Sequence, residues 1–131
     1  MIIADLKDIN YCGLHSKNEA QLSILDPSGY HLQLSLTIGE KEKDGGDYFD
    51  VDVFNTKLVK NGKVILASKS FIVADDIDDI DDIEKEIKYF INSISGESWC
   101  DVLIQLRRHF DWEYENHKFV DLASIGIGDV D

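Results

Sequence analysis

Two stretches of alternating apolar and polar residues constrain the fold of this chain most strongly. In residues 30–38 leucine and isoleucine occupy every second position, and in residues 47–56 phenylalanine and valine do the same. Successive side chains of a β-strand point to opposite faces of its sheet, so this pattern predicts two strands, each with one apolar and one polar face. The second strand places Asp50 and Asp52 on the polar face. Two like charges on one strand aid neither folding nor packing, so these aspartates are the first candidates for a functional role.

Turn signals place further strands around this pair. Residues 64–73 are rich in valine and isoleucine and follow Asn61-Gly62, a dipeptide favoured in tight hairpin turns, so we expect them to complete a three-stranded antiparallel meander. The short stretch 21–25 precedes an Asp-Pro-Ser-Gly turn and is expected to form a hairpin with the strand that follows. Further strand candidates are residues 2–9 and 117–122.

After the third strand the apolar period changes to that of a helix. Isoleucine and phenylalanine recur at steps of three and four over residues 75–94, and the aspartates at the start suit the positive end of a helix dipole. Ser98, with Asp101 three residues later, is expected to cap a second helix. The glycine-containing segment 123–131 is expected to be a loose tail. The sequence therefore predicts a single domain over residues 1–131 of the α+β class, with an antiparallel sheet of four to six strands and two C-terminal helices packed on one face.

Charge is the unusual feature of the composition. The chain has 26 acidic and 13 basic residues, which gives a formal net charge of −13. Such a surface repels nucleic acids and anionic membranes and attracts a basic partner. No stretch approaches the roughly 18 apolar residues of a membrane span, the N-terminus does not resemble a signal peptide, and two cysteines make no disulfide framework. We therefore expect a cytoplasmic protein with neither nucleic-acid nor membrane partners, and its oligomeric state stays open.

The patterns of common catalytic and metal sites do not occur in the sequence. The run DDIDDIDD lacks the glycine and the alternate carboxylates of a calcium loop, and it suits the surface of a helix better. The four histidines have no metal-like spacing, and no nucleophile or phosphate-binding motif occurs. A carboxylate pair such as Asp50 and Asp52 can in principle act in acid–base catalysis, but no such motif accompanies it. We therefore expect no enzymatic activity, no metal and no cofactor.

Binding of a basic partner is the class of function that remains. The acidic residues gather over residues 40–52, over residues 75–86 and in the segment DWEYE. Solvated surface charge explains any one of them equally well, but the excess over the whole chain favours a basic ligand. The candidate contact residues are Asp47, Asp50, Asp52, Asp76, Asp79, Glu113 and Glu115.

Short motifs follow one another in a specific order over about residues 30–116. They comprise Leu36, Ile38 and Gly39, then Gly45, Asp47, Phe49 and Val53, then Gly96, Ser98 and Trp99, and finally Trp112, Glu113 and Glu115. This order resembles the immunity protein 8 family of bacterial polymorphic toxin systems. The resemblance implies a cytosolic antidote that binds and blocks a toxin domain without catalysis, and it does not identify the toxin.

The predicted function is that of an immunity protein that neutralises a cognate toxin domain. A basic nuclease is the expected toxin, because nucleases must bind phosphates. An acidic adaptor or regulatory module for another basic protein is the alternative, which only the identity of the partner would distinguish. A small enzyme that uses Asp50 and Asp52 is a third hypothesis, and loss of turnover in asparagine variants would reveal it.

Overall fold

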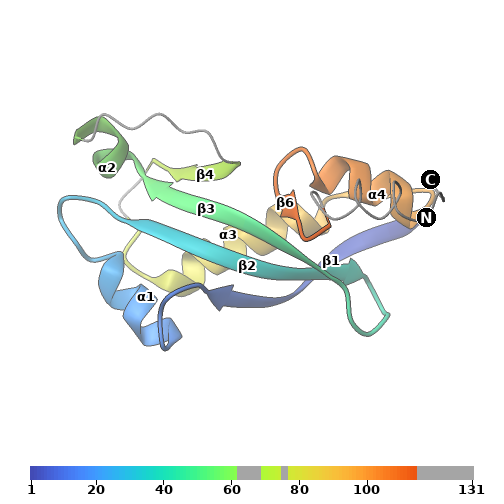
Figure 1. The fold of residues 1–131 in the computed structure, drawn as a ribbon, viewed down its shortest axis with the longest axis horizontal. Helices are drawn as coiled ribbons and strands as arrows, with labels where there is room; N and C mark the ends of the chain where they lie inside the picture. The colour runs from blue at the N-terminus through green and yellow to red at the C-terminus, as the bar shows by residue number, and fades with distance from the viewer. Residues whose placement is uncertain (62–68, 75–76, 115–131) are drawn as a thin grey trace, which may run out of the picture.

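The computed structural model describes residues 1–61, 69–74 and 77–114. Figure 1 shows one curved sheet with helices around it. The strands are β1 (Ile2–Tyr11), β2 (His31–Glu40), β3 (Asp47–Asn55), β4 (Ser70–Val73), β5 (Ser95–Gly96) and β6 (Asp111–Trp112). The helices are α1 (Lys17–Ser23), α2 (Thr56–Asn61), α3 (Ile80–Asn92) and α4 (Trp99–Leu106). The strand order is β4-β3-β2-β1-β5, and β6 pairs with β3. The predicted α+β class is confirmed.

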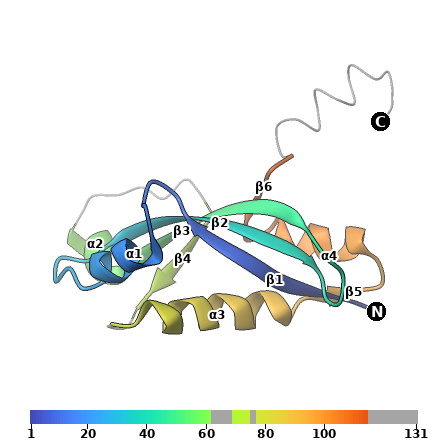
Figure 2. The same cartoon turned by 90° about the horizontal axis from the view of Figure 1, so that it is seen from below.

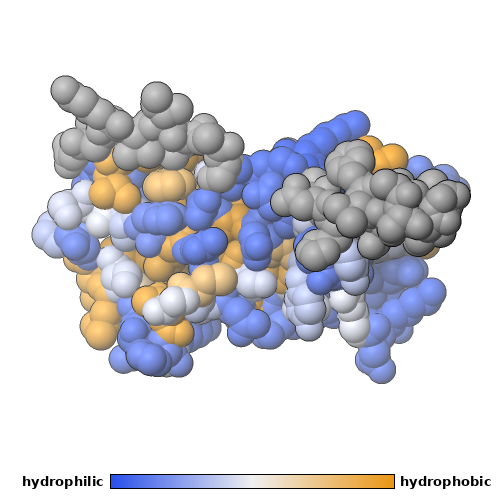
Figure 3. Space-filling model, viewed as in Figure 1, coloured by the Kyte–Doolittle hydropathy of each residue, from blue (hydrophilic) through white to orange (hydrophobic). Residues whose placement is uncertain are grey.

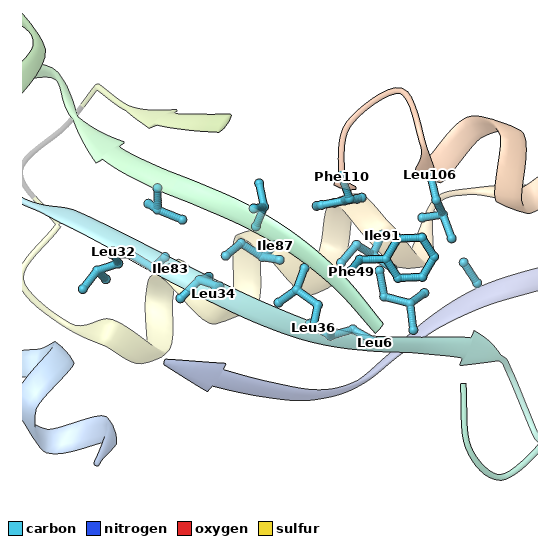
Figure 4. Packing of buried hydrophobic residues seen from close by; sticks show 14 of the residues in the cluster. Leu6, Leu32, Leu34, Leu36, Phe49, Ile83, Ile87, Ile91, Leu106 and Phe110 are labelled. Atoms are coloured by element: carbon cyan, nitrogen blue, oxygen red, sulfur yellow. The ribbon is translucent and has the colours of Figure 1, made fainter. Parts of the chain in front are cut away.

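The alternation in β2 and β3 builds the centre of the core. The antiparallel register places Leu36 opposite Phe49 and Leu34 opposite Val51, so that the apolar positions of both strands share one face. All four side chains are buried. Helix α3 lies across this face (Figure 2) and adds Ile83, Ile87 and Ile91 to the same cluster (Figure 4).

Both C-terminal helices begin at the kind of residue that the sequence predicts. The side chain of Asp79 accepts a hydrogen bond from the Asp81 N–H at 2.9 Å and caps α3, which starts at Ile80 rather than at residue 75. The Ser98 hydroxyl accepts one from the Asp101 N–H at 3.2 Å and caps α4. Such caps satisfy backbone donors that have no partner within the helix.

The prediction of a strand at residues 21–25 is wrong, because helix α1 occupies this part of the chain. Ser16 caps the helix by accepting from the Glu19 N–H, and Ala20 and Ile24 bury one side of it. Serine followed three residues later by glutamate is the sequence signature of a capping box, so the signal for this helix was present. The expected hairpin over residues 21–38 therefore does not form.

The predicted meander is also wrong in its third strand. After β3 the chain forms helix α2. The buried Asn55 stabilises the first turn of this helix, because its Oδ1 accepts a hydrogen bond from the Lys57 N–H at 3.0 Å. Strand β4 then pairs with β3 in parallel, with Asp52 opposite Ser70. The sheet is consequently mixed rather than purely antiparallel. Residues 62–68, the strand expected at 117–122 and the tail expected at 123–131 lie outside the described residues.

Glycines fix the turn between β2 and β3. A Cβ atom on Gly39 would lie 2.2 Å from the carbonyl oxygen of Gly45, and Gly45 itself has a φ of +77°. Side chains other than hydrogen are strained in such a conformation. These two glycines of the sequence motif are thus explained by the fold alone.

A polar cluster ties β1 to α3. The Asp5 carboxylate accepts hydrogen bonds from Lys88 Nζ at 3.2 Å and Asn92 Nδ2 at 3.0 Å, and Lys7 Nζ lies 3.3 Å from it. Burial by itself would raise the pKa of Asp5, but the hydrogen bonds from Lys88, Lys7 and Asn92 outweigh it and hold the pKa below its usual value. Asp5 therefore stabilises the fold most when it is ionised.

We expect this cluster to make the fold acid-sensitive. A carboxyl group whose pKa is lowered by folding contributes stability above its unfolded pKa, which is about 3.9, and loses it as the pH falls through the folded pKa. Urea unfolding followed between neutral pH and strongly acidic pH should show that Asp5→Asn is less stable than wild type at neutral pH, with the difference vanishing in acid. A difference that stays constant with pH would contradict this role for Asp5.

Candidate partner-binding face

The sheet face opposite α3 carries the polar half of the strand alternation. We define the outer face by the side chains of Asp8, Asn10, Gln33, Ser35, Thr37, Tyr48, Asp50, Asp52 and Asp111. Figure 3 views the molecule from this side and shows hydrophilic residues along its middle. Among the described residues, Gln33, Tyr48, Asp50 and Asp111 of this face are exposed.

The pairing register places the acidic side chains of the outer face next to one another. Asp50 lies opposite Ser35 on one side and opposite Asp111 of β6 on the other. Asp52 follows two residues along the same strand, at a distance of roughly 7 Å given the rise per residue. Like charges directly opposite each other destabilise a sheet, so the fold gains nothing from the pair of Asp50 and Asp111.

Basic neighbours compensate this charge only in part. Lys69 Nζ lies 3.8 Å from Asp111 Oδ1, and its side chain also donates to the carbonyl oxygen of Arg107. His31 Nε2 lies 2.8 Å from Asp52 Oδ1, and the imidazole ring stacks on Phe54 with 4.4 Å between centroids. In the described part of the chain, no lysine, arginine or histidine lies within ion-pair distance of Asp50. The centre of the outer face is therefore negative.

The negative charge of the outer face affects the pKa of the Cys12 thiol. Cys12 continues β1 at the outer face, where its N–H donates to the carbonyl oxygen of Gln33 at 2.9 Å. Partial burial raises the pKa of this thiol, and the charges of Asp50 and Asp52 raise it further. The two aspartates of β3 thus act together on a thiol that lies just beyond the end of β1.

Two large apolar side chains flank the acidic centre. Tyr48, opposite Thr37, is 55% exposed, and Ile72 of β4, opposite Phe54, is 46% exposed. Exposed aromatic and aliphatic side chains are the usual anchors of protein interfaces. The outer face thus combines charge in the middle with apolar contacts at its ends.

The structure separates the predicted contact residues into groups. Asp50 and Asp52 lie at the centre of the outer face, as predicted from the alternation. Asp47 instead accepts from Trp112 Nε1 at 3.2 Å, and Glu113 accepts from the Tyr48 N–H at 3.2 Å, so both are engaged in joining β6 to β3. Asp79 lies at the start of α3 in the other layer. Asp76 and Glu115 are outside the described residues.

Asp8, Tyr48 and Asp111 lie on the outer face but were not among the predicted contact residues. Asp111 reaches it through the short strand β6, which has only two residues and no alternation to reveal it. Asp8 points outward because β1 changes register between Leu6 and Asp8, which shifts the alternation by one residue. Tyr48 occupies a polar position of β3, so the alternation itself could have singled it out.

The structure also bears on a metal site, a membrane span and the two cysteines. Over residues 1–61, 69–74 and 77–114, no group of three or more histidine, cysteine, aspartate or glutamate side chains is placed to hold a metal ion. No helix in that part of the chain combines the length and apolar character needed to cross a membrane. Both cysteines, Cys12 and Cys100, are free and exposed.

Comparison with known proteins gives one match. A family model described as immunity protein 8 matches residues 5–117, which span the described strands and helices almost from end to end. No curated protein and no solved structure matches the chain.

Proposed function

Since the chain belongs to the immunity protein 8 family and is thus an immunity protein against a toxin, we propose that it neutralises a basic toxin domain, a nuclease, by binding it through the outer face. The single observation that carries this proposal is the acidic cluster of Asp50, Asp52 and Asp111, in which no cation of the described residues lies within ion-pair distance of Asp50. A charge arrangement that costs stability persists in a protein when a function requires it.

Charge complementarity supports a nuclease as the toxin. An enzyme that cleaves nucleic acid binds phosphates and is therefore basic around its active site. A chain with a net charge of −13 is attracted to such a surface over long distances, which raises the association rate. Inhibition by binding requires no chemistry from the antidote, and we propose that it acts without catalysis in the cytoplasm, where it would meet the toxin's substrate.

Apolar contacts must supply much of the affinity. Surface ion pairs contribute little each, since water and salt screen them. Tyr48 and Ile72 are the exposed apolar side chains beside the acidic centre, and they can fill pockets on the toxin. The acidic centre would then orient the partner, while these anchors slow its dissociation.

The proposal is tested with a candidate toxin domain taken from a gene that neighbours the gene for this chain, carrying an inactivating substitution. We expect a complex with a dissociation constant near or below about 10 nM, and an association rate that falls about 10-fold or more when salt increases from 50 to 500 mM. Surface plasmon resonance measures both. A basic toxin domain of unrelated specificity is the control and should not bind.

The expected cellular result is that the chain restores growth to cells that express the active toxin. Absence of both binding and protection would overturn the proposed function. Tight binding to a basic protein that is not a toxin would favour the adaptor alternative.

A further inference from the structure

One edge of β1 carries backbone groups that have no hydrogen-bond partner among the described residues. β1 pairs with β2 over Ala4–Tyr11, but with β5 only at Ile2 and Ile3, so the rest of its second edge faces α3. At Leu6 the side chains of α3 take the place of a strand, since Asn92 Oδ1 accepts its N–H at 3.0 Å and Lys88 Nζ donates to its carbonyl at 3.0 Å.

The register shows which groups remain beyond Leu6. The Cys12 N–H points to β2, where it donates to Gln33. Because backbone groups alternate between the two edges of a strand, those of Ile9 and Tyr11 point away from β2. The Tyr11 carbonyl accepts the Leu14 N–H at 3.3 Å. The Ile9 N–H, the Ile9 carbonyl and the Tyr11 N–H are left without a partner within the described part of the chain.

A groove of about 790 Å³ lies between this edge and the first half of α3. Ile9, Tyr11 and Leu14 line it and are half-buried against the core. Hence the groove offers backbone donors and acceptors together with an apolar surface, which is the combination that proteins use to bind an extended peptide as an added strand.

Charge is distributed unevenly along the groove. At the end near the start of α3, Asp79, Asp81, Asp82 and Glu84 line it, and Lys17 bridges Asp81 and Glu84. At the other end the lining residues are Lys7, Lys85 and Lys88. Asp5 pairs with two of these lysines and Asp8 also lines the groove, so the excess at this end is a single positive charge. The groove is consequently negative at one end and positive at the other.

We propose that this groove binds an extended segment of the toxin, which pairs with β1 at Ile9 and Tyr11 as an additional strand. The segment would place an apolar side chain against Ile9 and Leu14, a basic residue toward Asp82 and an acidic residue toward Lys85. This proposal rests on the proposed function for the identity of the partner. It extends the outer face by one strand beyond Asp8 and Asn10, so a toxin held at the edge would also cover the acidic centre.

The same edge is protected against pairing with other copies of the chain. A register shift between Leu6 and Asp8 interrupts it, and the side chains of Asn92 and Lys88 occupy its start. Bulges and lysines are the means by which proteins block unwanted pairing at sheet edges. Within the described part of the chain, the stretch of this edge that stays available is the short one around Ile9 and Tyr11, which favours a partner that fits the groove beside it.

Two variants at Ile9 separate the backbone contact from the side-chain contact. Ile9→Ala removes the side chain and keeps the N–H, whereas Ile9→Pro removes both. The Ile9 N–H faces the groove, so proline leaves the ladder to β2 intact. We expect Ile9→Pro to bind the inactivated toxin domain about 10-fold more weakly than Ile9→Ala. Equal affinities of two folded variants would overturn the proposal.

A charge exchange tests the polarity of the groove if proline impairs folding. The double variant Asp82→Lys/Lys85→Glu keeps the net charge of −13 and both positions are exposed on α3. We expect it to weaken toxin binding about 10-fold or more, because it reverses the charges that face the segment. An unchanged affinity would contradict the proposed occupant.

Amide hydrogen exchange followed by NMR measures the backbone pairing between β1 and the toxin segment directly in the wild-type chain. The Ile9 and Tyr11 amides should exchange rapidly in the free protein and at least about 100-fold more slowly in the complex. A toxin complex in which both amides exchange at the free rate would overturn this inference and leave the proposed function intact. If the toxin domain does not bind the wild-type chain at all, both the proposed function and this inference are overturned.

Discussion

Replacing Phe110 by alanine is expected to lower the free energy of unfolding by about 3–5 kcal/mol. The Phe110 ring is fully buried after α4 and makes edge contacts with Phe49 of β3, Phe71 of β4 and Phe90 of α3, at centroid distances of 6.4, 5.6 and 6.3 Å. Its removal leaves a cavity between three elements that cannot all move to fill it. Urea denaturation measures the loss.

The matched control for Phe110 is an aromatic residue that touches little. Tyr89 lies on α3 and is 78% exposed, so Tyr89→Ala should change the free energy of unfolding by less than about 0.5 kcal/mol. A loss below about 1 kcal/mol for Phe110→Ala would show that the aromatic cluster does not hold these elements together.

Local pattern was sufficient to predict the elements that pack by their own periodicity. The alternation in β2 and β3 predicts which face of each strand is buried, and the structure places Leu34, Leu36 and Phe49 together on that face. The three- and four-residue period of isoleucines likewise predicts α3 and its buried face, which includes Ile83. In these cases the same residues specify both the element and its position.

The elements that were missed depend on contacts from distant parts of the chain. Asn61-Gly62 suggested a hairpin, but the buried Asn55 and the bond from Thr56 Oγ1 to the carbonyl oxygen of Val73, at 2.7 Å, support a helix and a parallel crossover instead. β6 forms because the Trp112 indole reaches Asp47 from 65 residues away. No local period encodes such bonds.

The candidate site was predictable to the same extent. Asp50 and Asp52 followed from the alternation of a single strand. The position of Asp111 beside Asp50 and the outward turn of Asp8 depend on a two-residue strand and on a register shift, respectively. Similarly, the acidic character of Asp47 and Glu113 indicated a contact surface, whereas their hydrogen bonds show a role within the fold.

Reversing the charge of the outer face should weaken toxin binding more than any other exposed change. We expect Asp50→Lys/Asp52→Lys to reduce the affinity for the inactivated toxin domain about 100-fold or more at 50 mM salt, and distinctly less at 500 mM. The matched control is Glu86→Lys/Glu97→Lys, which changes the net charge equally at exposed positions on α3 and in the loop before α4. Equal losses in both variants would mean that net charge alone attracts the toxin.

Neutralising Asp50 should weaken toxin binding without any loss of stability. Neutralising Asp50 relieves its repulsion with Asp111, so Asp50→Asn should leave the free energy of unfolding unchanged or raise it by up to about 0.5 kcal/mol. The same variant should bind the toxin domain more weakly, since it removes charge at the centre of the outer face. A residue with a purely structural role would lose stability and binding together. Measuring both quantities on this one variant therefore decides whether the aspartate is present for the partner rather than for the fold.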